Sequence, residues 1–291
     1  MRELREEPLS RHGFWRVGGP LERLCVVDSG AELRALGRDV HVLGNGSNLL
    51  IPDAGLPGTT VRLAGEFREL SVVSESGGEV VVRAGGGLLN TVLLQRLEKL
   101  GLCGLGCLAG VPGTVGGAVA MNAGTVLGEV SAIVVAVEGA SGDRVSRAEL
   151  PMRYREGGLP TGFIVTAANF PCARAGVEAE RSAVASHLAR RKASQPLDLP
   201  SCGSVFRNPP GDHAGRLIEL VGLKGWQSGG AQISPKHANF IVNVEAATAT
   251  DVMRCIRKAW DTVLAETGVR LVPEVHVLGE WDPEIWPLPA A

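Results

Sequence analysis

Apolar and polar residues alternate in several short runs along the first two thirds of the chain. Valine and other β-branched residues are common in these runs, and glycine or a polar cluster ends most of them. A period of two is the pattern of a half-buried strand. It predicts strands at residues 39–43, 59–63, 79–84, 131–139 and 163–170, with a return strand at 144–146 after a hairpin turn at 141–143.

Helical patterns occupy four other segments, and the mix of predicted helices and strands changes near residue 196. Strands dominate before this point, whereas helices and strands mix after it, without strict alternation of strand and helix. The pattern therefore predicts an α+β fold with two domains rather than a doubly wound sheet. The expected helices are 88–100, 179–192, 215–221 and 250–267, and the expected later strands are 238–244 and 269–278.

Charge and cysteine content exclude several classes of protein. The net charge is −2 with both signs interspersed, so neither a nucleic-acid footprint nor a polybasic membrane surface is expected. No apolar run approaches the roughly 20 residues of a membrane span, and the charged N-terminus does not resemble a signal peptide. The six cysteines lack metal-ligand spacing, which predicts buried thiols, no metal and a cytoplasmic location.

Glycine is the unusual component, at 39 of 291 residues against an ordinary share of ~7 %. The segment 104–109 matches G-x-G-x-x-A, but it follows a helix and a loop instead of a strand, which argues against a dinucleotide fingerprint. Residues 109–118 hold four glycines, a proline and a threonine, a backbone able to lie against a planar or phosphorylated cofactor. The loop at 44–48 follows a predicted strand and fits either an anion-binding loop or a plain turn.

Three polar residues stand in unusual surroundings, and their sequence context alone leaves two interpretations open for each. Ser204 lacks the flanks of a hydrolase nucleophile elbow, so it is either a turn residue or a group with another chemical role. Glu274 stands inside an apolar run, where it either faces water or is buried with a partner. Arg155 is either a surface charge or a ligand for an anion.

Six motifs stand in order along the chain. They are GNGSNLL at 44–50, GLCGLGCLAGVPGTVGGAVAMNAG at 101–124, YR at 154–155, QPLDLPSCGSVFRNP at 195–209, AGRLIELVGLKGWQSGGAQISPKHANFIVN at 214–243 and LVPEVHVLGEW at 271–281. Taken together, they resemble the UDP-N-acetylenolpyruvoylglucosamine reductase (MurB) family, which reduces a peptidoglycan precursor. The segment between residues 155 and 196 is too short for a substrate-covering insertion, as in the shorter variety of that family.

The resemblance implies a fold and a reaction. The expected fold is α+β, with an FAD-binding region of the vanillyl-alcohol-oxidase type at 1–195, in lobes of about 1–65 and 66–195. A C-terminal α/β substrate-binding domain follows at 196–291, and its last strand, 269–281, either stays there or returns to the flavin region. The implied activity is an NADPH-dependent reduction, through FAD, of the enolpyruvyl ether of a UDP-sugar. A different flavoprotein oxidoreductase of the same fold is the alternative.

The resemblance also implies roles for individual residues. Ser204 matches the proton donor, and Arg155 and Glu274 match the groups beside the substrate carboxylate; Glu274 can help there only if it is protonated or shares a proton. Residues Asn208, Lys224 and His237 match substrate-binding positions. The implied FAD contacts are Gly44, Asn45, Gly46, Ser47, Asn48, Leu49, Val111, Pro112, Gly113, Thr114, Gly116, Gly117 and Asn122.

The sequence departs from the family pattern at several positions near the implied flavin contacts. Gly13 and Phe14 stand where the family often has threonine or asparagine, and Thr125-Val126 replaces a common tyrosine-containing pair. Glu156 follows Arg155 where a serine is usual. These departures concern individual cofactor contacts and leave Ser204, Glu274 and Arg155 in place.

Overall fold

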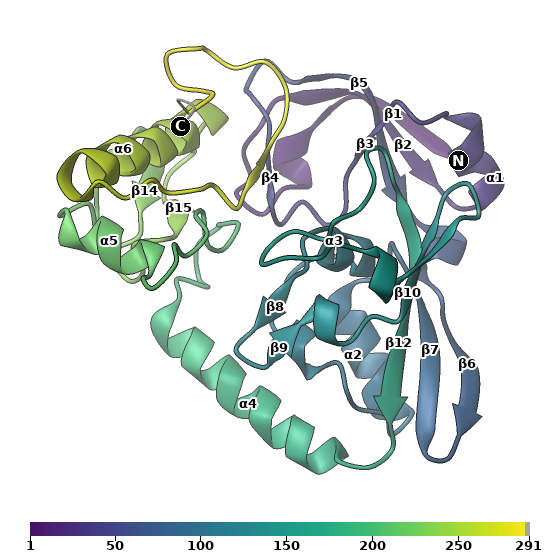
Figure 1. The fold of residues 1–291 in the computed structure, drawn as a ribbon. Helices are drawn as coiled ribbons and strands as arrows, with labels where there is room; N and C mark the ends of the chain where they lie inside the picture. The colour runs from purple at the N-terminus through teal and green to yellow at the C-terminus, as the bar shows by residue number, and fades with distance from the viewer. Residues whose placement is uncertain (289–291) are drawn as a thin grey trace. The chain divides into compact units, whose positions relative to one another are not determined.

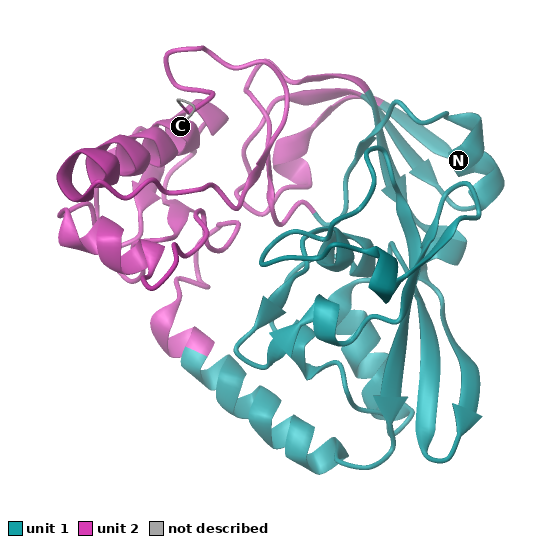
Figure 2. Ribbon diagram, viewed as in Figure 1, with its two compact units in different colours: residues 1–4, 23–45, 59–190 teal, residues 5–22, 46–58, 191–291 magenta. Residues whose placement is uncertain are grey.

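The chain forms two units in a computed structural model that describes residues 1–288 (Figures 1 and 2). Unit 1 consists of Met1–Leu4, Arg23–Asn45 and Thr59–Arg190, and unit 2 of Arg5–Glu22, Gly46–Gly58 and the chain from Arg191 onward. The predicted boundary at 195/196 lies near the last of these breaks, although two earlier segments also belong to unit 2. The domain limits of the sequence analysis stay a prediction.

The main sheet of unit 1 is antiparallel. Val80, Val82 and Ala84 on one strand alternate inward and are fully buried, whereas Arg83 between them pairs with Glu138 on the other face at 2.7 Å. This is the period of two that the sequence displays. The strand order is β11 (Arg144–Ser146), β10 (Ala136–Gly139), β12 (Val165–Ala173), β7 (Glu79–Gly85) and β6 (Leu70–Ser76).

Two helices share the hydrophobic core of this sheet. Leu93 and Leu97 of α2 (Asn90–Lys99) and Val115 and Val119 of α3 (Val115–Ala120) join the same buried cluster as the inward residues of β7 and β12. The hairpin β8 (Gly124–Thr125) and β9 (Gly128–Glu129) follows α3. The helix α4 (Val177–Ser194) is largely exposed, and His187 is its buried residue.

A second sheet has the order β1 (Arg2–Pro8), β2 (Pro20–Val27), β5 (Leu56–Leu63) and β3 (His41–Val42). In unit 1, Val27, Val61 and Leu63 from this sheet pack with Leu33 of the helix α1 (Gly30–Ala35). The Ser29 side chain caps α1 by accepting the Glu32 N–H.

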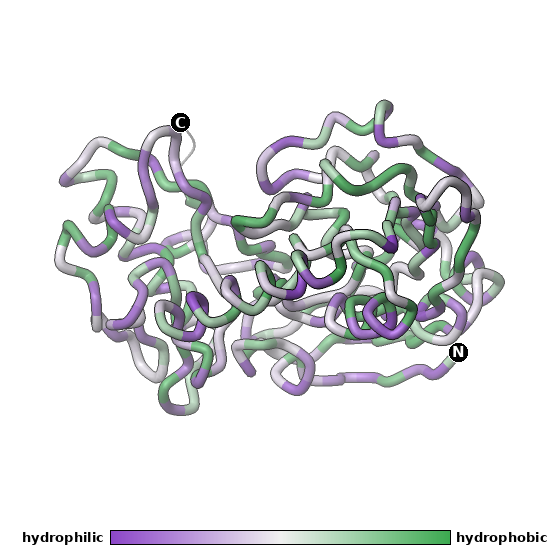
Figure 3. Tube along the Cα trace, turned by 90° about the horizontal axis from the view of Figure 1, so that it is seen from below, coloured by the Kyte–Doolittle hydropathy of each residue, from purple (hydrophilic) through white to green (hydrophobic). Residues whose placement is uncertain are grey.

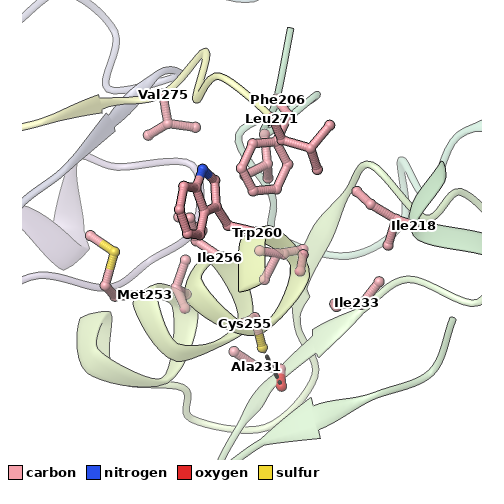
Figure 4. Close-up of a cluster of buried hydrophobic side chains, with 14 of the residues drawn as sticks. Phe206, Ile218, Ala231, Ile233, Met253, Cys255, Ile256, Trp260, Leu271 and Val275 are labelled. Atoms are coloured by element: carbon pink, nitrogen blue, oxygen red, sulfur yellow. Dashed lines mark hydrogen bonds between the residues drawn. The ribbon is translucent and has the colours of Figure 1, made fainter. Parts of the chain in front are cut away.

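Unit 2 is built around the amphipathic helix α6 (Ala249–Thr267). Thr248 and Asp251 form a capping box at its start, and Gly268 ends it in the left-handed conformation, with φ of 70°. Figure 4 shows Met253, Ile256 and Trp260 of α6 in one cluster with Phe206 and Val275. The other elements are α5 (Ala214–Leu220), β13 (Gln227–Ser228), β14 (Ala231–Ile233), β15 (Ile241–Asn243), and β16 (His276–Val277) paired in parallel with β4 (Leu49–Leu50).

Most predicted elements are present, and the errors have physical reasons. The predicted strand 131–139 begins only at Ala136, because residues 130–132 form a 3₁₀ turn. The predicted strand 269–278 shrinks to His276–Val277; Pro273 within it lacks the N–H that a ladder needs. The pattern did not predict α1, α3, β1, β2 and β6, nor the short strands β8, β9, β13 and β14. Of these strands, β1 and β6 are largely exposed and show no apolar alternation.

Hydropathy changes every few residues along the chain, as the colours of the tube in Figure 3 show. Long uniformly apolar helices are therefore missing from the described part of the chain. No helix in residues 1–288 is long and apolar enough to cross a membrane.

Candidate active site

The glycine-rich run at 111–117 is fixed to unit 1 by main-chain hydrogen bonds. Asn90 donates from its main-chain N–H to the Gly113 carbonyl at 3.0 Å and from its side chain to the Val111 carbonyl at 3.3 Å. The Val115 and Gly116 N–H groups donate to the Leu88 and Gly86 carbonyls. These hydrogen bonds define the shape of the run.

Several of the glycines implied to contact FAD are required by the backbone itself. A Cβ on Gly46 would lie 2.4 Å from the His12 carbonyl oxygen, and one on Gly116 would lie 3.0 Å from the Gly86 carbonyl oxygen. Gly113 has a φ of 125°, a conformation that other residues rarely adopt. These three glycines allow close packing and a tight turn, whether or not they also contact a ligand.

Two other glycines implied to contact FAD, Gly44 and Gly117, lie beside Thr114. Thr114 caps α3 by accepting the Gly117 N–H at 3.2 Å, and a Cβ on Gly44 would lie 3.1 Å from its Oγ1. The two predicted cofactor loops therefore meet at Thr114 in unit 1. Gly117 is exposed, and a Cβ there would lie at ordinary contact distance from Thr114 Oγ1, at 3.5 Å. Side-chain-free backbone at this point permits the close approach that a cofactor diphosphate needs.

The remaining residues implied to contact FAD differ in exposure. Pro112 is exposed and Thr114 and Asn122 are buried, while the others in this set are half-buried. The half-buried residues not yet placed are Asn45, Ser47, Asn48, Leu49 and Val111.

Arg155 occupies a tight turn in unit 1. Arg153 and Glu156 exchange main-chain hydrogen bonds of 2.9 Å each, which leaves Tyr154 and Arg155 as the two central residues. Arg155 has a φ of 59°, an unfavourable conformation for a residue with a side chain. Its guanidinium stacks over the Tyr154 ring, 5.0 Å from the centroid, and donates to the Gly124 carbonyl at 3.3 Å.

Ser204 and Glu274 lie on neighbouring backbone segments of unit 2. The Glu274 N–H donates to the Val205 carbonyl at 2.7 Å, and the Arg207 N–H donates to the Val272 carbonyl at 2.9 Å. Both Ser204 and Glu274 are half-buried. The structure thus brings together two of the three residues predicted to be catalytic, although 69 positions separate them in the sequence.

Two asparagine side chains hold these segments, and the sequence analysis missed both roles. The buried Asn239 accepts the Phe206 N–H at 3.0 Å and donates to the Phe206 carbonyl at 2.8 Å, as a neighbouring strand would. Asn48, which the family resemblance implied as a cofactor contact, donates to the Glu274 carbonyl at 2.9 Å. Only the preference of asparagine for main-chain partners could have suggested these roles.

The three residues predicted to bind substrate gather around α5 in unit 2. Asn208 accepts the Ala214 N–H at 3.1 Å and so caps the first turn of the helix. Lys224 pairs with Glu219 at 2.8 Å, and a Cβ on Gly215 would lie 3.1 Å from His237 Cε1. The helix α5 therefore places an amide, an ammonium and an imidazole in one region.

Burial controls the ionisation of two groups here. It lowers the pKa of His237, and the positive charge of Lys224 lowers it further. The Asn239 N–H donates to Nδ1 of His237 at 3.3 Å, which assigns the proton of the neutral ring to Nε2. Burial also raises the pKa of Cys202 to about 12, so this thiol near Ser204 stays protonated and is a poor nucleophile.

The described residues show no group of three or more His, Cys, Asp or Glu side chains able to hold a metal ion. Arg155 belongs to unit 1, and Ser204 and Glu274 belong to unit 2.

Two family models match the chain. Residues 26–143 match an FAD binding domain, and residues 195–278 match the C-terminal domain of UDP-N-acetylenolpyruvoylglucosamine reductase. These matches, with the mixed helices and strands of the structure, confirm the predicted α+β fold with an FAD-binding region and a C-terminal domain. They also agree with the prediction of an FAD-containing oxidoreductase.

Individual relatives cover nearly the whole chain. The UDP-N-acetylenolpyruvoylglucosamine reductase of Myxococcus xanthus is 43% identical over 94% of this chain and 92% of its own length. That of Moorella thermoacetica is also 43% identical, over 95% and 93%. The crystal structure of MurB from Thermus caldophilus superposes with a TM-score of 0.83 at 38% identity, covering 96% of this chain and 98% of that one. The chain therefore belongs to the UDP-N-acetylenolpyruvoylglucosamine reductase family, as its motifs predicted.

Proposed function

We propose that the protein reduces the enolpyruvyl ether of UDP-N-acetylglucosamine enolpyruvate to UDP-N-acetylmuramate, a step in peptidoglycan precursor synthesis. The observation that carries the proposal is the 43% identity to named reductases over 94% of the chain. The close backbone pairing of the Ser204 and Glu274 segments supports it further, because the proposed reaction needs both residues.

The cofactors of the proposed reaction are FAD and NADPH. When bound, FAD supplies hydride from its N5 position, and NADPH supplies the electrons. The backbone at Gly44, Thr114 and Gly117 would hold the cofactor, because two glycines without side chains adjoin the Thr114 hydroxyl there. Every other task in the reaction falls to side chains of the protein.

Negative charge builds up on the substrate carboxylate when hydride reaches the neighbouring double bond, and this charge has to be stabilised where it develops. The guanidinium of Arg155 is permanently charged and planar, which suits a carboxylate. Glu274 can assist only as an acid or by sharing a proton, because two anions would repel. Its half-buried position and its fixed backbone are compatible with that task.

Ser204 is the proposed proton donor to the second carbon of the double bond. A hydroxyl is a weak acid, so the alkoxide that it leaves needs nearby cationic or N–H donors. Arg207, Lys224 and the loop at Gly203, all in unit 2, are candidates for this support.

The region around α5 is the proposed binding site for the nucleotide part of the substrate. Lys224 is suited to a diphosphate as a point charge. Its present pair with Glu219 is partly exposed, with the Glu219 side chain 58% accessible, and such pairs contribute only about 0–1 kcal/mol. Exchange of Glu219 for a diphosphate therefore costs little. Asn208 and His237 add an amide and an Nε2–H donor.

A purified sample tests the proposal. The protein should contain FAD, oxidise NADPH only when the enolpyruvyl sugar nucleotide is present, and form UDP-N-acetylmuramate in equal amount. A flavoprotein that consumes NADPH and oxygen without this substrate would instead be a different oxidoreductase of the same fold. A protein without flavin would contradict both. The cytoplasmic location and the absence of nucleic-acid partners stay predictions.

A further inference from the structure

The turn that carries Arg155 is anchored to the end of α3. The Gly157 N–H donates to the Ala120 carbonyl at 2.9 Å, and a Cβ on Gly157 would lie 2.3 Å from the Val119 carbonyl oxygen. Since α3 begins at the glycine-rich run, one short helix connects the predicted cofactor loop with the Arg155 turn. Only a glycine at 157 permits this approach.

Asn122 ties the same turn from a second direction. Its side-chain NH₂ donates to the Arg153 carbonyl at 2.8 Å and to Glu129 Oε2 at 3.0 Å, and its oxygen accepts the Ser131 N–H at 2.8 Å. Both donors of the amide are therefore used within the protein, together with one lone pair of the oxygen. Asn122 itself is 1% exposed, so its amide is shielded from water.

We propose that Asn122 is a positioning residue that fixes Arg155 for the reaction, a role that rests on the proposed function of Arg155. The Arg153 carbonyl that accepts from Asn122 also accepts the Glu156 N–H that closes the turn. Loss of the amide releases one side of the turn, and Arg155, at a φ of 59°, then relaxes toward more favourable conformations. This role contrasts with the cofactor contact that the family resemblance implied for Asn122.

Asparagine meets two requirements that no other side chain combines here. Residue 122 has a φ of 41°, which asparagine tolerates better than most residues. Aspartate would keep the acceptor for Ser131 but lose both donors, and it would add a negative charge beside Glu129. Glycine would suit the backbone conformation and remove only the side-chain hydrogen bonds, so Asn122→Gly is the clean test.

The chain offers a direct spectroscopic reporter of this turn, because Tyr154 is its single tyrosine. Protein labelled with 3-fluorotyrosine should give one sharp ¹⁹F resonance. In Asn122→Gly that resonance should shift and broaden, and the Glu156 and Gly157 amide hydrogens should exchange at least 10-fold faster. An unchanged spectrum and unchanged exchange in a folded variant would overturn the proposal, even if the protein proved to have another activity.

Asn169→Ala is the matched control. Asn169 is also a buried asparagine of unit 1, 3% exposed, and its Oδ1 has no hydrogen-bond partner within residues 1–288. Its truncation should leave the Tyr154 resonance unchanged. A change of equal size in both variants would show a general loosening of unit 1 and would contradict a specific role for Asn122.

A double-mutant cycle with Arg155→Ala supplies the catalytic readout. Asn122→Gly should slow flavin reoxidation by the enolpyruvyl substrate about 10–100-fold, as expected for a residue that orients a functional side chain. In the Arg155→Ala background the same change should cost less than about 2-fold, because the two residues act as a unit. Additive losses, or weaker FAD binding to apoprotein without any change at the turn, would overturn the proposal in favour of a cofactor contact. Failure of wild-type protein to reduce the substrate would contradict the proposed function alone.

Discussion

Two regions that carry the proposed catalytic residues are held by different physical means. In unit 1, Arg155 is half-buried in a two-residue turn that depends on a few polar contacts and on one glycine. In unit 2, Ser204 and Glu274 adjoin Val205, Phe206 and Val275, which are 1%, 1% and 6% exposed in the core of the unit. The first region therefore gains its geometry from hydrogen bonds, and the second mainly from apolar burial.

This difference between the two regions predicts which mutations each of them tolerates. Removing one hydrogen bond costs about 0.5–1.5 kcal/mol, whereas truncating a buried aromatic side chain costs several times more. Changes near Arg155 should therefore reduce activity while the fold persists. Changes beneath Ser204 and Glu274 should reduce the stability of unit 2 as a whole.

The largest expected effect comes from Phe206→Ala. This truncation should lower the free energy of unfolding of unit 2 by about 3–5 kcal/mol. All five tryptophans lie in unit 2, so urea unfolding followed by tryptophan fluorescence reports this unit directly. A loss below 1 kcal/mol would contradict the proposed difference between the two regions, since the Ser204 region would then not depend on apolar burial.

The next largest effect is expected from Arg155→Lys, which should change the rate of substrate reduction and not the stability of the protein. A lysine keeps the charge but replaces a planar fork by a single point, which should slow substrate reduction on the order of 10²-fold. The tryptophan-detected unfolding of unit 2 should match wild type. Turnover within 3-fold of wild type would remove Arg155 from the mechanism.

Asn239→Ala should reduce both the stability of unit 2 and the rate of substrate reduction, by smaller amounts. It leaves the Phe206 N–H and carbonyl without their side-chain partner, which should cost about 1–3 kcal/mol in unit 2. Flavin reoxidation by substrate should slow at the same time, because the neighbouring Ser204 loses part of its support. A stability loss with an unchanged single-turnover rate would restrict Asn239 to a structural role.

The smallest expected effect is a pH dependence from His237. Burial holds its pKa below the ordinary 6.5, so between these two values the unfolded chain binds more protons than the folded protein. Its contribution to stability is therefore fully present above pH 6.5 and declines as the pH falls through that window. The urea midpoint of wild type minus that of His237→Gln should decrease from pH 8 to pH 5. A difference that increases would contradict the assigned shift.

The proposed catalytic residues could be predicted from the sequence, but the side chains that hold them in place could not. The motifs around Arg155, Ser204 and Glu274 identify the family, because these residues sit in long, distinctive segments. The partners of Asn48, Asn122 and Asn239 depend on backbone carbonyls that the fold brings near them, and no local pattern encodes such contacts. A single asparagine looks alike in a turn, a cofactor loop or a backbone clamp.

The fold likewise contains elements that the sequence predicts and elements that it does not. The strand at residues 79–85 and the helix at 249–267 were predictable because each has one buried face. The strands β1 and β6 were not, because their side chains are largely exposed and carry no apolar alternation. The segment 269–278 was wrongly predicted to be one strand because its side chains alternate as in a strand. Most of the segment forms only an isolated bridge and single hydrogen bonds to neighbouring segments.

The central claim is that the Ser204 region serves only the step in which substrate takes up hydride and proton. Rapid-mixing absorbance of the bound flavin separates that step from reduction by NADPH. In Ser204→Ala, reduction by NADPH should stay within about 2-fold of wild type, and reoxidation by the enolpyruvyl sugar nucleotide should slow by about 10²–10⁴-fold. Equal slowing of both steps, or normal reoxidation, would contradict the account.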